Sequence, residues 1–301
     1  MMECNLLTIF TPTYNRSYIL PKLYETLLGQ TDKNFEWILV DDGSTDQTEE
    51  IVRTWIEEGM INICYLKQPN QGKHVAINKG LDFANGELFF IVDSDDSLKL
   101  DAVEKIRDFW RMYGSDKFSG ILSYREFPDG KLVGTPLPKE VKQCKLRDAE
   151  SEYGSSGDKV VIYRTEIISQ FRYPKFEGEK FFGESFVFNQ IDDMMDMLVM
   201  DEKIYIFDYQ KDGLSQNFRK LYRENPLGML TSMKQALKYK ADKKEVIKTL
   251  AHIGCISIKT NNLLNYFREG KSMTRLISFP FAIGLYIKIF ILKANDVKPF
   301  K

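Results

Sequence analysis

The sequence of 301 residues contains few of the residues that usually mark a metal centre or a disulfide framework. It has four cysteines, none of them in a CxxC pair, and only two histidines. This scarcity argues against a structural zinc site or a disulfide-bonded scaffold, and it favours a reducing compartment. We expect His74 to be a surface residue or to lie beside a site, and His252 to serve packing.

The net charge is also close to zero, because the chain has 42 basic and 43 acidic residues. Nucleic-acid binders usually carry a basic excess, so a polynucleotide is not expected as a partner. The N-terminus lacks the basic and apolar regions of a signal peptide, which predicts a cytoplasmic location. No GxGxxG motif follows the first apolar run, which disfavours a dinucleotide oxidoreductase. With 43% hydrophobic residues, however, the chain can bury a sizeable core.

The N-terminal part of the chain alternates short apolar runs with amphipathic stretches. Such alternation predicts an α/β fold with a mostly parallel sheet, flanked by helices, that binds ligands beyond the carboxyl ends of its strands. The expected strands cover 6–11, 35–41, 61–66 and 88–93, and the expected helices cover 17–28, 45–57 and 73–84.

Polar clusters follow all four expected strands. They read TPTYNR at 11–16, DDGSTD at 41–46, QPNQGK at 68–73 and DSDD at 93–96. Each cluster alone is explained by turn and helix-cap chemistry. Turn chemistry does not explain acidic pairs at two strand ends together with a lysine that opens a helix at a third. The four clusters therefore predict one shared site.

The DSDD cluster carries the strongest chemical signal. Mg²⁺ and Mn²⁺ prefer oxygen ligands and typically use one or two carboxylates, with phosphates and water filling the remaining positions. Asp93 and Asp95 therefore predict a metal and diphosphate site. We expect Asp96 to cap a following helix.

Four segments, TPTYNR, VDDGSTDQT, NQGKHVAINKGLDFANGE and FIVDSDD, together resemble the family-2 glycosyltransferases of the GT-A fold. Those enzymes build bacterial polysaccharides from nucleotide-activated sugars. The resemblance is close over the first third of the chain and looser to Gln216, through FEGEKFFGES and YQKDGLSQN. It implies a GT-A (Rossmann-like) sheet, a nucleotide-sugar donor, most simply a UDP-sugar, and a Mn²⁺ or Mg²⁺ cofactor.

The resemblance also assigns the donor site, residue by residue. The implied positions are Pro12, Thr13 and Tyr14 beside the nucleobase and ribose, Asp42 as acceptor from the uracil ring, Lys73 on the base or phosphates, Asp93 near the ribose, Ser94 in the variable middle and Asp95 as the metal ligand. For Tyr14, simple packing is the alternative.

An inverting transfer needs a general base for the acceptor hydroxyl. The resemblance places it near the start of a helix after the fourth strand, where this sequence offers Glu184. The family's second acid is replaced by Ser185, so Glu179 stays an alternative. Glu184 can also be a carboxylate that favours a helix N-terminus through the dipole.

The following segments are expected to complete the catalytic half. Residues 186–200 read as a helix, and residues 204–209 read as a strand. Arg219 and Lys220 are expected either to reach the diphosphate or the acceptor, or to form a solvated charge pair. Residues 117–163, with a hairpin signal at 129–130, read as acceptor-side loops.

The composition of the C-terminal part predicts helices at 227–240 and 243–267. An apolar segment follows at 276–292. Lys288 interrupts that segment, so its uninterrupted run is shorter than the roughly 20 residues of a membrane span. Basic residues flank it at Arg275, Lys293, Lys298 and Lys301. The segment around 275–293 is expected to be a monotopic membrane anchor near a lipid-linked acceptor. A buried helix or a contact between two copies of the chain is the alternative.

The sequence thus predicts three parts: residues 1–98 bind the nucleotide-sugar, 99–220 bind the acceptor and complete the GT-A domain, and 221–301 form a helical extension. The predicted activity is an inverting, metal-dependent sugar transfer to a hydroxyl of a surface glycan or lipid-linked saccharide. One alternative is a phosphotransferase of the haloacid-dehalogenase type, because FIVDSDD also resembles its nucleophile strand. Another alternative is an inactive scaffold that keeps the fold.

Overall fold

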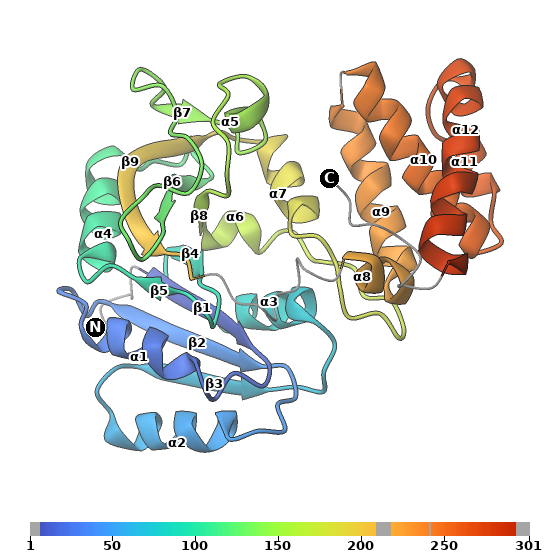
Figure 1. Cartoon of the computed structure of the whole chain (residues 1–301). Coiled ribbons are helices and arrows are strands. Elements are labelled where there is room, and N and C mark those ends of the chain that lie inside the picture. Colours follow the sequence, from blue (N-terminus) through green and yellow to red (C-terminus); the bar gives the residue numbers. More distant parts are fainter. Residues whose placement is uncertain (1–6, 209–217, 241, 293–301) are drawn as a thin grey trace. The chain divides into compact units, whose positions relative to one another are not determined.

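The computed structural model describes residues 7–208, 218–240 and 242–292 (Figure 1). The chain divides into two compact units. We call them the sheet unit, with Met1–Tyr173 and Val187–Gln210, and the helical unit, with Pro174–Phe186 and Lys211–Lys301. The predicted functional division at residues 98 and 220 stays a prediction.

In the described part of the chain, nine strands form one sheet with the order β3-β2-β1-β4-β8-β6-β9-β5, and β7 pairs with β9. The strands are β1 (Leu7–Thr13), β2 (Phe35–Asp41), β3 (Ile63–Lys67), β4 (Leu88–Ile91), β5 (Ser97–Leu98), β6 (Gly120–Glu126), β7 (Gln143–Cys144), β8 (Val160–Arg164) and β9 (Met197–Ile206).

The first four strands pair in parallel, as the alternating pattern predicts. Every residue of β1 and β2 is buried, which is typical of strands covered on both faces. The register places Thr13 beside Asp41, so the polar segments after β1 and β2 start at one edge.

The other half of the sheet is mixed, because β8 runs antiparallel to both β4 and β6 while β6 and β9 are parallel. The expectation of a mostly parallel sheet therefore holds for one half only. The long connection between β6 and β8 contains no crossover helix, and an antiparallel return does not need one.

The helices of the sheet unit cover both faces of the sheet. Residues of α1, α2 and α4 share one core with Trp37 and Leu39 of β2. On the opposite face Phe10 stacks on Phe89, and a Cβ at Gly80 of α3 would lie 2.3 Å from the Phe10 ring. The helices between β1 and β9 are α1 (Leu20–Leu28), α2 (Thr48–Glu58), α3 (Lys73–Leu81), α4 (Ala102–Tyr113), α5 (Asp148–Ser151), α6 (Thr165–Ile168) and α7 (Ser185–Asp192).

The connection between β6 and β8 is held at its base by a buried lysine. The ammonium of Lys159 donates to the carbonyl oxygens of Ser156 at 2.6 Å and Gly157 at 2.9 Å. The predicted turn at 129–130 is present, since the Gly130 amide donates to the Phe127 carbonyl and Gly130 has φ 81°. A backbone position in this left-handed region favours glycine.

The predicted helix at 186–200 is wrong in its second half, because α7 ends at Asp192 and β9 begins at Met197. Leucine and methionine favour helices in isolation. Here Leu198 and Val199 pair with Ile121 and Leu122 of β6, and this burial outweighs local propensity.

The helical unit has its own core, centred on α10. A Cβ at Gly254 of α10 would lie 2.7 Å from the Cβ of Ala282 on α12, so these helices pack closely. Its elements are α8 (Phe218–Glu224), α9 (Pro226–Ala236), η2 (Leu237–Tyr239), α10 (Lys243–Lys259), α11 (Leu264–Phe267), α12 (Ser272–Tyr286) and the π-helical η3 (Ile287–Ile291).

The apolar C-terminal segment forms a longer helix than the sequence indicated. Residues Ser272–Ile291 make one helix of 20 residues with a mean hydropathy of 1.5, which is long and apolar enough to cross a membrane by length and composition. Only 17% of its apolar window is buried. A simple buried core helix is therefore the wrong description.

His74, expected at the surface or beside a site, is only 2% exposed on α3. Burial lowers the pKa of His74 to about 4. The folded state therefore binds fewer protons than the unfolded chain between pH 6.5 and 4, and stability falls as pH falls through this window.

We predict that His74→Gln weakens the pH dependence of stability. Between pH 6.5 and 4 the unfolding free energy of the wild type should fall by about 3 kcal/mol more than that of the variant. All three tryptophans, Trp37, Trp55 and Trp110, lie in the sheet-unit core. Tryptophan fluorescence during urea unfolding at several pH values thus reports this unit. Equal pH slopes for the two proteins contradict the prediction.

Candidate active site

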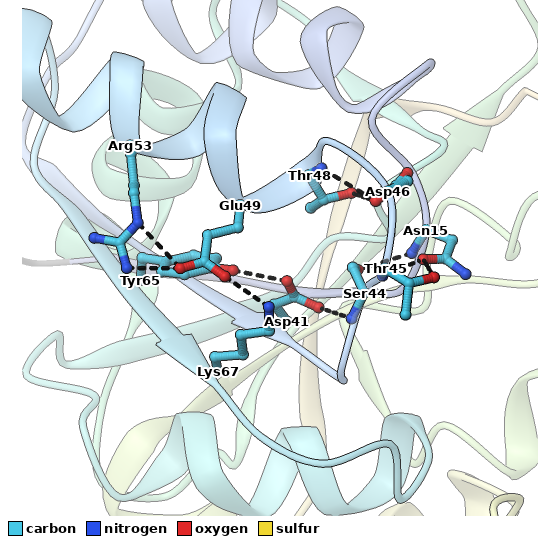
Figure 2. A network of polar contacts seen from close by, with 10 residues as sticks. All are labelled: Asn15, Asp41, Ser44, Thr45, Asp46, Thr48, Glu49, Arg53, Tyr65 and Lys67. Atoms are coloured by element: carbon cyan, nitrogen blue, oxygen red, sulfur yellow. Dashed lines mark hydrogen bonds and ion pairs between the residues drawn. The ribbon is translucent and has the colours of Figure 1, made fainter.

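The segments after β1 and β2 are locked together by side-chain hydrogen bonds to backbone amides (Figure 2). The Asn15 amide donates to Oγ of Ser44 at 2.8 Å, and the Thr45 amide donates to Oδ1 of Asn15 at 2.8 Å. Asn15 has φ 53°, a left-handed conformation that asparagine tolerates better than most residues. These bonds fix the path of the chain where strand one leaves the sheet.

Two aspartates of the DDGSTD cluster act as structural acceptors. Asp41, which is fully buried, accepts from the Ser44 amide and from the Tyr65 hydroxyl, each at 2.7 Å. Figure 2 shows its carboxylate between these two donors. For Asp46 burial alone would raise the pKa, but hydrogen bonds from Thr48 and Ser17 lower the pKa to about 2.

Asp42 connects β2 to the segment that follows β3. Its carboxylate accepts from Nε2 of Gln68 and the Gln71 amide at 2.8 Å, and from the Gly72 amide at 2.7 Å. Gly43 approaches the same segment closely, because a Cβ there would lie 2.9 Å from the Asn70 amide nitrogen. Asp42 therefore fixes the start of α3, where Lys73 stands. Its predicted contact with a uracil ring stays a prediction.

Lys73 opens α3 and reaches across to the acidic turn after β4. Its ammonium lies 2.6 Å from Oδ1 of Asp93. Burial alone would raise the pKa of Asp93, but Lys73, Arg125 and Arg16 together lower that pKa. Asp93 is therefore held as a carboxylate by three surrounding cations.

Asp95 points toward Arg16, with 3.5 Å between the guanidinium and Oδ2. Burial and the charge of Asp93 raise the pKa of Asp95, while Arg16 acts in the opposite direction. The carboxylates of Asp93 and Asp95 are two residues apart and repel each other when both are charged. An additional cation beside them stabilises the charged form of both.

Asp96 is not the helix cap that the sequence predicted, because strand β5 follows it. Its Oδ2 accepts from the Tyr205 hydroxyl at 2.6 Å, and its Oδ1 accepts from the Asp208 amide at 2.9 Å. Burial, together with the charge of Asp93, raises the pKa of Asp96 to about 7 despite these two donors. The Tyr205 hydroxyl also accepts from the Asp93 amide at 3.1 Å, so one buried tyrosine fixes both ends of the turn.

The donor set of this turn fits a divalent cation that shares its ligands with phosphate. Within the described ranges, no group of three or more histidine, cysteine, aspartate or glutamate side chains is arranged to hold a metal by itself. Mg²⁺ and Mn²⁺ sites at phosphates commonly need only one or two carboxylates from the protein. The carboxylate oxygens of Asp93 and Asp95 are of the kind that such a site uses, and a cation there would counter the effects that raise the pKa of Asp95.

The other predicted donor residues lie on the same edge. Thr13 and Ser94 are buried, whereas Tyr14 leaves 47% of its surface exposed after the end of β1. The structure thus joins Asp42 to Lys73 through Gly72, and Lys73 to Asp93. Pro12 and Thr13 belong to β1 itself and border this edge from inside the sheet.

The candidate bases belong to the helical unit. Glu179 accepts from the Leu227 and Gly228 amides at 2.8 and 2.7 Å, so its carboxylate caps the N-terminus of α9. Glu184 is half-buried in the turn directly before α7. Lys220 on α8 is exposed, and the side chain of Arg219 and residues 209–217 lie outside the described residues.

Two residues of this site, Arg125 and Tyr205, lie outside the sequence motifs, and Arg16 lies in TPTYNR but was assigned no role. The Arg125 guanidinium stacks 4.7 Å from the centre of the Tyr205 ring and contributes to the low pKa of Asp93. A charged residue in the otherwise apolar run GILSYRE was the available signal for Arg125. Tyr205 gave none, because an aromatic residue in a strand usually serves packing.

The fold is that of known nucleotide-sugar transferases. Staphylococcus aureus TarS 1–349 in complex with UDP-GlcNAc superposes with a TM-score of 0.59 at 21% identity, covering 94% of this chain and 81% of TarS. A mannosyltransferase of Pyrobaculum calidifontis, in complex with GDP-Man and Mn²⁺, reaches 0.54 at 15% identity, covering 96% and 83%. These similarities define the GT-A fold.

The sequence comparisons give the family. The profile described as Glycosyl transferase family 2 matches residues 8–140. A putative teichuronic acid biosynthesis glycosyltransferase, TuaG of Bacillus subtilis, is 38% identical over 136 residues, 44% of this chain and 51% of TuaG. Glycosyltransferase GlyA of Streptococcus pneumoniae is 37% identical over 106 residues, 35% of this chain and 15% of GlyA.

Residues 8–140, less than half of the chain, therefore form a domain similar to glycosyltransferase family 2. The similarity spans about half or less of the length of these curated relatives. The names of these relatives therefore apply to the matched domain alone, and the activity of the whole chain is a proposal.

We predict that Tyr205→Phe lowers the unfolding free energy of the sheet unit by about 1–3 kcal/mol, the usual result of leaving buried polar groups unpaired. The change keeps the ring and removes only the hydroxyl that joins Asp93 to Asp96. Urea unfolding followed by tryptophan fluorescence measures the effect. Tyr113→Phe, at a position that is 55% exposed, is the matched control and should change little. Equal stability of the two variants would show that the hydroxyl is dispensable.

Proposed function

We propose that the protein transfers a sugar from a nucleotide-sugar, most simply a UDP-sugar, to a hydroxyl of a surface glycan or lipid-linked saccharide, with inversion at the anomeric carbon. The observation that carries the proposal is the acidic turn at 93–96, held against Lys73 and Arg16 at the strand ends of a family-2 domain. The complexes of TarS with UDP-GlcNAc and the name of TuaG support a donor and an acceptor of this kind.

The donor is bound by groups from all four strand ends in this proposal. The exposed Tyr14 ring provides a face for the nucleobase beside Pro12 and Thr13. Asp42 orders the segment that carries the Lys73 ammonium toward the phosphates. In this proposal Asp93 accepts from a ribose hydroxyl beside its ion pair with the Lys73 ammonium.

Asp95 would hold a Mn²⁺ or Mg²⁺ ion, with Asp93 beside it and the buried Ser94 between them in the sequence. When bound, such an ion neutralises the charge that develops on the leaving diphosphate. Arg16 and Lys73 act on the same charge from the protein side. The cations around Asp93 keep its carboxylate charged, which preserves the negative site that attracts the ion.

Inversion follows from a single displacement with one general base. The acceptor oxygen forms a bond to the anomeric carbon while the bond from that carbon to the phosphate oxygen breaks, and UDP leaves. The acceptor hydroxyl passes its proton to the carboxylate of Glu184. We prefer Glu184 to Glu179, because both oxygens of Glu179 are already engaged by the first amides of α9.

The haloacid-dehalogenase alternative is disfavoured by the same geometry. A nucleophilic Asp93 would have to leave its ion pair with Lys73, and such a reaction gives no role to the TPTYNR and DDGSTD clusters. A scaffold without activity would keep donor binding but not hydrolyse or transfer the sugar. A thermal-shift screen of nucleotide-sugars with and without Mn²⁺, followed by a hydrolysis assay of the best binder, separates all three.

For Asp95→Ala we expect loss of sugar transfer and loss of metal-dependent UDP binding, because the substitution removes the carboxylate that would face the ion. Transfer is measured with radiolabelled UDP-sugars, and UDP binding by calorimetry with and without Mn²⁺. Asp108→Ala, which removes an acid of α4 whose side chain is 56% exposed, is the control and should behave as the wild type. Full activity of Asp95→Ala would refute the metal assignment.

Glu184→Gln should leave donor binding nearly intact and reduce turnover by roughly 10²- to 10⁴-fold, the scale of general-base loss. The amide keeps the size of the side chain but cannot take the proton. Glu177→Gln, an exposed position in the same segment, is the matched control. If Glu184→Gln turns over at the wild-type rate, the base is another group.

A further inference from the structure

The C-terminal helix has two opposite faces. The inner face is fixed against the helical unit, where Ser278, Ala282 and Ile289 are buried. The Tyr266 hydroxyl bonds Oγ of Ser278 at 2.8 Å, and Ala282 packs on Gly254. These contacts hold α12 as part of a folded unit and determine which of its residues point away from the core.

The outer α12 face is apolar along its whole length. Met273, Leu276, Ile277, Phe281, Ile287 and Ile291 are between 41% and 72% exposed. At about 100° per residue these positions fall on the side of the helix opposite Ser278 and Ala282, so they form one stripe. Soluble monomers rarely leave a continuous apolar stripe of this length uncovered.

The charges around this stripe are of one sign. Within Ser272–Ile291 the two ionisable charges are Arg275 and Lys288, both basic. Arg268 and Lys271 precede the helix, and the nearby Glu269 is ion-paired with Lys234 at 3.5 Å. An apolar stripe with a basic margin complements an anionic lipid surface. In a symmetric pair of chains, two such margins would face each other and repel.

A hollow at the end of the stripe adds a place for an anionic headgroup. It has a volume of about 360 Å³ and is lined by Arg223, Lys259, Phe290, Ile291 and Leu292. Two of the Arg223 nitrogens donate to the carbonyls of Ile289 and Leu292, which leaves further guanidinium donors of its five N–H groups. The Lys259 ammonium lies 5.4 Å over the Phe290 ring. Cations beside apolar side chains match a lipid phosphodiester next to its acyl chains.

We propose that the outer α12 face docks on the surface of an anionic lipid bilayer, with the Arg223 and Lys259 hollow taking a lipid phosphate. The helix lies in the plane of the interface, because its inner face stays bound to α10. A helix that crossed the bilayer would have to give up the Ser278 and Ala282 contacts. The surface stands independently of the proposed sugar transfer and would bring that activity to lipid-linked acceptors.

The test is co-sedimentation of the full-length protein with vesicles of phosphatidylcholine, with and without phosphatidylglycerol. We expect binding to the mixed vesicles that high salt weakens. Leu276→Gln combined with Phe281→Gln should weaken binding about 100-fold, since two large apolar side chains no longer enter the interface. Lys259→Gln and Lys288→Gln should each weaken binding to the anionic vesicles about fivefold.

Met112→Gln is the matched control, because Met112 is 70% exposed on α4 of the sheet unit. It should bind vesicles like the wild type, and far-ultraviolet circular dichroism, which reports the helices of both units, should show that every variant is folded. Absence of wild-type binding, or binding unchanged in the double variant, overturns the proposal. The proposal is also overturned if sedimentation velocity shows a dimer for the wild type and a monomer for the double variant, while the two proteins bind vesicles equally. Resistance of bound protein to salt and alkaline extraction would indicate a spanning helix instead.

Vesicle binding and sugar transfer are read separately. Transfer to a soluble acceptor should be the same for the wild type and the double variant, because the outer α12 face holds none of the proposed donor-site residues. Vesicle binding without any transfer would refute the proposed function and leave the lipid surface standing. Transfer without vesicle binding would do the reverse.

Discussion

The site depends on one electrostatic constraint, the concentration of three carboxylates in the four-residue turn after β4. Carboxylates this close repel each other and are costly to bury unless cations or hydrogen-bond donors surround them. Lys73, Arg16 and Arg125 supply the cations, and Tyr205 supplies the donor to Asp96. These four residues come from four separate segments. The parallel half of the sheet, the β6 strand and the β9 strand must therefore all be formed before the turn is stable.

The parallel strands and their polar ends were predictable from the sequence, because both signals are local. Buried parallel strands appear as short continuous apolar runs, and turn residues follow them directly. Asp42, Lys73, Asp93 and Asp95 lie in such segments, and their roles in the site stay a prediction. The positions that were missed depend on contacts over long sequence distances. Arg125 and Tyr205 reach the site only through the mixed half of the sheet, whose pairing no periodic pattern announces.

Errors in the sequence interpretation have the same origin. Asp96 was expected to cap a helix, but the chain continues into β5, and its carboxylate is used by β9 instead. Residues 197–200 have helical propensity, yet pairing with β6 makes them a strand. The 20-residue C-terminal helix was underestimated, because Lys288 interrupts the apolar run in the sequence although it does not interrupt the helix. In the first two cases tertiary contacts outweighed a local preference.

The buried ammonium of Lys159 has a consequence for how such a domain diversifies. It closes the base of the connection between β6 and β8 by binding carbonyls on the strand-proximal side. Sequence changes at the exposed turn around Gly130 leave these hydrogen bonds, and the pairing of β7 with β9, in place. Surface connections of this kind carry recognition while the scaffold stays constant. The domain thus combines a fixed sheet with an exposed turn whose sequence can change without unfolding the protein.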